Sequence, residues 1–137
     1  MEKIKVKVDW CDKNYAAVTE DDRLCGMVIV TAKTYDALLD SLRKAIEEHV
    51  AEETNYAFPD WLAEGRFDFS VELGTAALLK QSEQYTTLVA IARESGISKA
   101  LLSHYANGLK KPSIMQRKRI CNGLRRIAHA LNDIPNE

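Results

Sequence analysis

The sequence lacks the segments and spacings that mark several large classes of protein. Among its 137 residues, no apolar run approaches the roughly 20 residues that a membrane-spanning helix needs. Its three cysteines, Cys11, Cys25 and Cys121, form no C-x-x-C pair, which disfavours a disulfide scaffold and a cysteine zinc site. Residues 1–8 alternate lysine with apolar residues and contain no continuous apolar stretch typical of a signal peptide. We therefore expect a cytoplasmic protein without a membrane segment.

Signatures of catalysis are also scarce. The sequence has no Gly-rich phosphate loop and no Ser/His/Asp or Cys/His set with a local signature. Asp9 is a lone candidate for holding a metal ion, whereas a metal-dependent nuclease clusters several carboxylates. His49 is more typical of an ordinary surface or interface histidine. We predict a protein that is not an enzyme, with no catalytic residues, no metal and no cofactor, and keep a metal-dependent nuclease as the third alternative.

The charges divide the chain into two unequal parts. Residues 1–79 carry 9 Lys and Arg against 16 Asp and Glu, whereas residues 80–137 carry 10 Lys and Arg against 4 Asp and Glu. The net charges are therefore −7 and +6, which together give the −1 of the whole chain. This asymmetry favours an acidic module joined to a basic module that attracts polyanions.

The acidic part has the pattern of a small α+β unit. Alternation of lysine with Ile4, Val6 and Val8 predicts a first strand. A returning strand is predicted over residues 15–18, and the apolar run within residues 25–31 predicts a more buried strand. Apolar residues at helical spacing, after a Thr34 cap, predict a helix through about residue 53. Residues 67–73 alternate again, so the order is βββαβ, with the last strand parallel to an earlier one.

The basic part has the pattern of short helices. One helix is predicted over residues 75–82. A second helix is predicted to begin at a Thr86 or Thr87 cap and to run to about residue 94, and a third, capped by Ser98, is predicted over residues 99–107. Ser113 begins a last helix, whose apolar stripe is predicted at Ile120, Leu124, Ile127 and Leu131. We place the domain boundary at Gly74, which gives an α+β domain over residues 1–73 and an all-α domain over residues 74–137.

Residues 92–102 have the spacing of a helix-turn-helix. The small residue Ala92 permits a close helix crossing, Gly96 allows the sharp turn, Ile97 fills the corner and Leu102 faces inward. In such a unit the second helix lies in the major groove of DNA.

The position of each residue along this unit predicts two sets of DNA contacts. The residues predicted to face base edges are Ser98, Lys99, Ala100, Ser103 and His104. The residues predicted to contact phosphate are Thr87, Lys110, Lys111, Arg117 and Lys118. Tyr105 is expected to pack against its own domain.

These residues also carry a family resemblance. The stretch GISKALLSHYANGLKKPS, residues 96–113, resembles the helix-turn-helix of Cro/repressor-type regulators. Its part LSHYANGLKKPS is especially similar to the C-terminal domain of HicB-type antitoxins, and residues 1–73 are similar to the HicB N-terminal domain. The resemblance implies a partial ribonuclease H-like fold, without catalysis, followed by the helix-turn-helix domain.

The resemblance further implies an antitoxin of a HicAB toxin–antitoxin system. Its N-terminal domain would neutralise a small basic toxin ribonuclease of the HicA type, and its C-terminal domain would repress the shared operon by binding double-stranded operator DNA. Candidate toxin contacts are the acidic residues Glu20, Asp21, Asp22, Glu47 and Glu48. We expect a homodimer or higher homo-oligomer, because paired units match palindromic half-sites. The alternative is a stand-alone transcriptional repressor whose N-terminal domain dimerises or senses a ligand.

Overall fold

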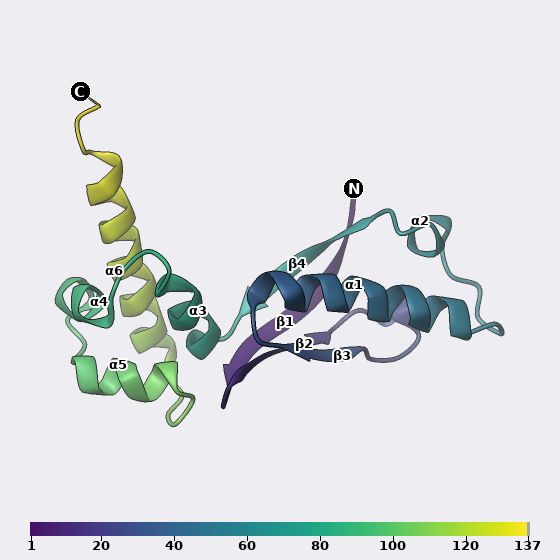
Figure 1. Cartoon of the computed structure of the whole chain (residues 1–137), viewed down its shortest axis with the longest axis horizontal. Helices are drawn as coiled ribbons and strands as arrows, with labels where there is room; N and C mark the ends of the chain where they lie inside the picture. The colour runs from purple at the N-terminus through teal and green to yellow at the C-terminus, as the bar shows by residue number, and fades with distance from the viewer. Residues whose placement is uncertain (137) are drawn as a thin grey trace.

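The computed structural model describes residues 1–136 and has an α+β fold, as predicted (Figure 1). Its mixed sheet has four strands: β1 (Glu2–Cys11), β2 (Asn14–Thr19), β3 (Ile29–Ala32) and β4 (Phe67–Leu73). The helices of the described residues are α1 (Tyr35–Glu52), α2 (Asp60–Ala63), α3 (Thr75–Ser82), α4 (Leu88–Ser95), α5 (Lys99–Ala106) and α6 (Ile114–Asn132). A 3-10 turn, η1, covers Asp22–Leu24.

The sheet has the strand order β3-β2-β1-β4. β1 and β2 form an antiparallel hairpin, and β4 pairs parallel to β1, which confirms the predicted crossover. α1 lies over one face of the sheet, while the opposite face stays uncovered (Figure 1). The covered face supplies Ile4, Val6 and Val8, which pack with Leu38 and Leu42 of α1 in the first hydrophobic core.

The prediction of a buried strand over residues 25–31 was wrong. Cys25 and Gly26 have positive φ angles of 51° and 124°, so the chain turns there instead of extending. β3 begins only at Ile29 and lies at an edge of the sheet, where the Ile29 side chain is 61% exposed. A continuous apolar run is typical of a strand that is covered on both faces of the sheet. β3 is covered on one face only, so the run does not indicate a fully buried strand here.

A second hydrophobic core lies among α3, α4, α5 and α6. Its buried residues include Leu79, Ile91, Leu102, Tyr105 and Ile120. Leu102 and Tyr105 therefore face inward, as predicted. The predicted stripe on α6 is buried only in its first half, because Leu131 is 56% exposed. Among residues 1–136, no helix combines the length and the apolar character needed to cross a membrane.

Candidate nucleic-acid interface

Capping residues set the ends of α4 and α5. The Thr87 hydroxyl accepts a hydrogen bond from the amide of Ala90 at 3.1 Å, and the Ser98 hydroxyl accepts one from the amide of Leu101 at 3.2 Å. Between the helices, Gly96 has a φ of +73°, a left-handed conformation that costs glycine little. Ile97 is 3% exposed and fills the corner. These local features position α5 across α4 through a tight turn.

The outward face of α5 is open to solvent. Ser98, Lys99, Ala100 and His104 are exposed and Ser103 is half-buried, so all five predicted base-contacting residues lie on one accessible surface. The inward residues of α5 fill the second core. The outward side chains make two local contacts: the Ser98 hydroxyl caps the helix, and the Ser103 hydroxyl accepts a hydrogen bond from Asn107 Nδ2 at 3.5 Å. This surface combines an ammonium, hydroxyls, an imidazole and a methyl group, which are the groups that read base edges.

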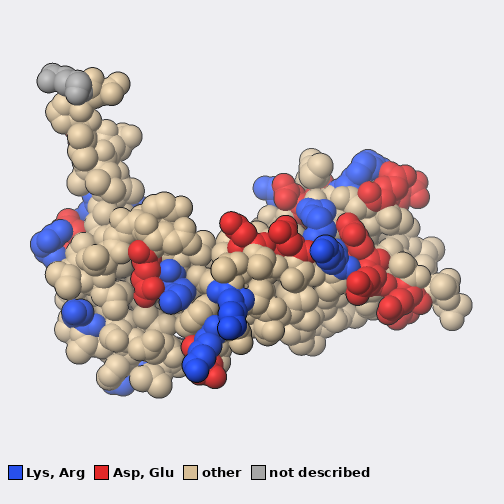
Figure 2. Space-filling model, viewed as in Figure 1, with Lys and Arg blue, Asp and Glu red and all other residues tan. Residues whose placement is uncertain are grey.

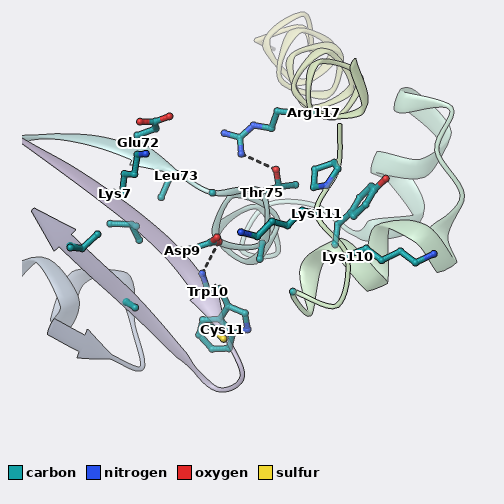
Figure 3. Close-up of a pocket in the computed structure, with 18 of the residues that line it drawn as sticks. Lys7, Asp9, Trp10, Cys11, Glu72, Leu73, Thr75, Lys110, Lys111 and Arg117 are labelled. Atoms are coloured by element: carbon teal, nitrogen blue, oxygen red, sulfur yellow. Dashed lines mark hydrogen bonds between the residues drawn. The ribbon is translucent and has the colours of Figure 1, made fainter. Parts of the chain in front are cut away.

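The residues predicted to contact phosphate differ in their surroundings. Lys110, Lys111 and Lys118 are exposed. Figure 3 shows Lys110 pointing away from the neighbouring groove and Lys111 pointing into it, toward Asp9. The Arg117 guanidinium donates to the Thr75 hydroxyl at 3.0 Å, so part of its hydrogen-bonding capacity is used within the chain (Figure 3).

Two arginines of α6 support the turn between α4 and α5, and sequence reasoning missed both roles. Arg126 donates to the carbonyl of Glu94 at 2.6 Å, and Arg119 donates to the carbonyl of Gly96 at 3.2 Å. These carbonyls lie at the C-terminal end of α4, where intrahelical donors run out and a positive charge is favoured. Beside them, Gly123 lets α6 approach Ser95 closely. The i, i+7 spacing of the two arginines was the only signal in the sequence.

Asp9 connects the sheet to the helices. Its Oδ1 accepts hydrogen bonds from the amide of Trp10 at 2.9 Å and from the amide of Ala77, in the first turn of α3, at 3.2 Å. A second contact also joins the sheet to the helices, because the Tyr15 hydroxyl of β2 donates to Gln81 Oε1 of α3 at 3.0 Å. Burial is the main cause that raises the pKa of Tyr15. Asp9 thus stabilises the start of a helix. Within residues 1–136, no group of three His, Cys, Asp or Glu is placed to hold a metal ion.

A groove separates the uncovered face of the sheet from the start of α6. It has a volume of about 930 Å³. Val18 and Ile29 line it from the sheet, and Lys111, Arg117 and Lys118 line it from the opposite wall. The groove therefore combines an apolar floor with cationic groups and with the carboxylates of Asp9 and Glu72.

The candidate toxin contacts fall into two groups. Glu20 pairs with Lys7 at 3.2 Å, and Asp21 pairs with Arg23 at 2.7 Å with only 8% of its side chain exposed. Hydrogen bonds from Arg23 hold the pKa of Asp21 below its usual value. These two acids have partners within the chain. Asp22, Glu47 and Glu48 are exposed, the last two on α1.

α1 presents an acidic outer surface. The helix carries Asp36, Asp40, Glu47, Glu48 and Glu52 against only Arg43 and Lys44. Arg43 points back to the sheet, where its guanidinium donates to the backbone carbonyl of Phe67 at 2.8 Å. The Cζ atom of Arg43 lies 4.4 Å from the centre of the Phe67 ring. Figure 2 shows acidic side chains gathered over this part of the molecule. The positive charge of Arg43 therefore does little to offset the carboxylates on the outer surface.

Comparisons with protein-family models, with curated proteins and with solved structures found no match for this chain.

Proposed function

We propose that the chain is a HicB-type antitoxin that binds operator DNA through α5 and a small basic toxin through its acidic N-terminal part. It acts by binding and not by catalysis. In this proposal residues 1–73 form the partial ribonuclease H-like domain, and residues 74–137 form the helix-turn-helix domain. The observation that carries the proposal is the open face of α5, where Lys99, Ser103 and His104 lie together.

The DNA part of the proposal is supported by geometry and charge together. The turn at Gly96, the cap at Ser98 and the buried Leu102 orient the helix so that its polar face is free. Exposed lysines follow directly after the helix, where phosphate contacts hold a reading helix in register. A basic module with these features suits the major groove of duplex DNA.

Lys110 provides a test of the phosphate contacts. We expect Lys110→Ala to weaken DNA binding about equally on all sequences and to lower the slope of log affinity against log salt by about one. The Lys111→Ala variant should lower the slope less, because Lys111 points toward the Asp9 carboxylate. The measurement is fluorescence anisotropy, at several salt concentrations, with duplex DNA from upstream of the gene. Lys3→Ala, at the far end of β1, is the control, and an unchanged slope for Lys110→Ala contradicts this role.

The toxin part of the proposal rests on the acidic surface of α1. A basic partner is attracted to this surface by charge complementarity, which acts mainly on association rate and specificity. We expect the chain to co-purify with a small basic protein encoded by the adjacent reading frame. The double charge reversal Glu47→Lys with Glu48→Lys should reduce this association by at least about tenfold. Glu83→Lys, an equally exposed change on the helical part, should leave it intact.

The groove favours a second candidate function. Its apolar floor and cationic edge suit a small amphipathic anion, as a stand-alone repressor with a ligand-sensing N-terminal domain requires. The two candidates are separated by the co-purification experiment. If the neighbouring frame encodes no basic partner, the antitoxin proposal fails and the stand-alone repressor takes its place.

A further inference from the structure

Leu109 is an exposed leucine in the connection between α5 and α6. Just before it, Gly108 has a φ of +74°, and its amide donates to the carbonyl of Tyr105 at 3.1 Å. The amide of Leu109 donates to the carbonyl of His104 at 2.9 Å. These two hydrogen bonds form a Schellman motif, in which the residue at the position of Leu109 commonly makes an apolar contact with the last turn of the helix.

That apolar contact is missing at the end of α5. Leu109 is 72% exposed. The last-turn residues that it would cover are Ser103 and His104, which are polar and belong to the face proposed to read bases. The next residues, Lys110 and Lys111, line the groove beside the sheet, whereas Leu109 does not. The hydrogen bond to the His104 carbonyl therefore keeps Leu109 beside the reading face, with most of its surface uncovered within residues 1–136.

The charges around Leu109 indicate which kind of partner covers it. Residues 95–132 contain eight Lys and Arg and no Asp or Glu, and two of the lysines follow Leu109 directly. Lysine is depleted at the centre of protein–protein interfaces, where an apolar anchor would lie. A polyanion, in contrast, is attracted to such a surface. Duplex DNA therefore fits this surface better than a protein partner does.

We infer that Leu109 packs against the C5-methyl group of a thymine in the major groove and contributes to the sequence preference of the protein. This inference rests on the proposed DNA binding by α5 and names one base that the site recognises. The thymine methyl is the apolar group that the major-groove edge of a base pair presents. Burial of one methyl group is worth about fourfold in affinity. The neighbouring lysines contact phosphate and carry no sequence information.

The test uses deoxyuridine, which differs from thymidine by this methyl group alone. Thymines of the bound site are replaced one at a time, and fluorescence anisotropy gives the dissociation constant of the full chain for each duplex. For the parent protein we expect one thymine in a half-site whose replacement weakens binding about fourfold. For Leu109→Ala, the same replacement should change the dissociation constant by less than about 1.5-fold, because the partner of the methyl group is gone.

Two further variants serve as controls. Leu109→Met retains a large apolar side chain and should keep the response to deoxyuridine. Leu131→Ala makes the matched change at a leucine that is 56% exposed near the C-terminal end of α6, away from α5 (Figure 1). It should also respond as the parent protein does. Circular dichroism checks that all variants fold, as the exposure of both leucines predicts.

The salt dependence separates a direct contact from damage to the loop. Leu109 carries no charge, so Leu109→Ala should leave the slope of log affinity against log salt unchanged. A lower slope would show that the variant displaces Lys110 and Lys111 from phosphate, and the inference then fails.

The remaining outcomes distinguish this inference from the proposed function. A parent protein that binds specific and shuffled duplexes equally contradicts the proposed function, and the inference with it. Specific binding that no deoxyuridine replacement weakens overturns the inference alone. The inference also fails if the methyl effect persists in Leu109→Ala, or if Leu109→Ala weakens binding equally on every duplex, as a contact with deoxyribose predicts.

Discussion

Replacing Lys99, Ser103 and His104 together with alanine is expected to abolish the preference of the protein for its own upstream DNA. Each good contact to a base edge is worth about 1–3 kcal/mol of discrimination. Loss of three such contacts should lower affinity for the specific site by at least about 100-fold, which leaves only binding to phosphate. All three side chains are accessible, so their removal should cost little stability. Competition binding with specific and shuffled duplexes measures the effect.

A matched control uses the same number of changes away from α5. The triple alanine variant of Gln84, Asn122 and Asn132 alters exposed or half-exposed polar groups of the helical part without touching the reading face. It should retain the parent preference for specific over shuffled DNA. Full specific affinity in the α5 variant, with the control unchanged, would show that α5 does not read the sequence.

Gly123→Leu is expected to destabilise the helical part through a clash with α4. A Cβ atom at Gly123 would lie 3.1 Å from the backbone nitrogen of Ser95 and 3.2 Å from its Cα. These are backbone atoms of a packed helix, so α4 must move to make room. The gain in helix propensity of about 1 kcal/mol is outweighed by overpacking, and we expect a net loss of about 2 kcal/mol. Urea unfolding followed by circular dichroism gives the value.

The adjacent position supplies the control for this prediction. Asn122→Leu introduces the same side chain on the exposed side of the same helix, where we expect a change within about 0.5 kcal/mol. Displacement of α4 also moves the turn that begins at Gly96, so Gly123→Leu should weaken DNA binding where Asn122→Leu does not. Equal stability of the two variants would contradict the close approach of α4 and α6.

Local signals predicted the helix starts of this fold well. Thr34, Thr87, Ser98 and Ser113 each cap a helix where the sequence placed one, because a hydroxyl followed by an apolar period acts on its own next few residues. The parallel orientation of β4 to an earlier strand followed from the chain order of strand, helix and strand, although that order did not identify β1 as the partner. The solvent-facing side of α5 followed from helical spacing around Leu102.

Contacts between distant segments were not predictable in the same way. The hydrogen bond from Ala77 to Asp9 joins residues 68 apart, and nothing near either residue marks the other as a partner. The carbonyl contacts of Arg119 and Arg126 depend on how α6 crosses α4, which periodicity does not specify. The pairing of the largely buried Asp21 carboxylate with the partly exposed Arg23 likewise requires the surrounding fold. The acidic loop that the sequence predicted as a binding surface therefore contains one carboxylate with a structural role.

The central claim is that α5 enters the major groove of duplex DNA. Methylation protection at guanine N7 tests it directly, because this atom lies on the major-groove edge of the base. With the full chain bound to DNA from upstream of its gene, we predict protected guanines in two half-sites about one helical turn apart, and loss of that protection in the Lys99, Ser103 and His104 alanine variant. Bound DNA whose guanines remain fully reactive would contradict the account.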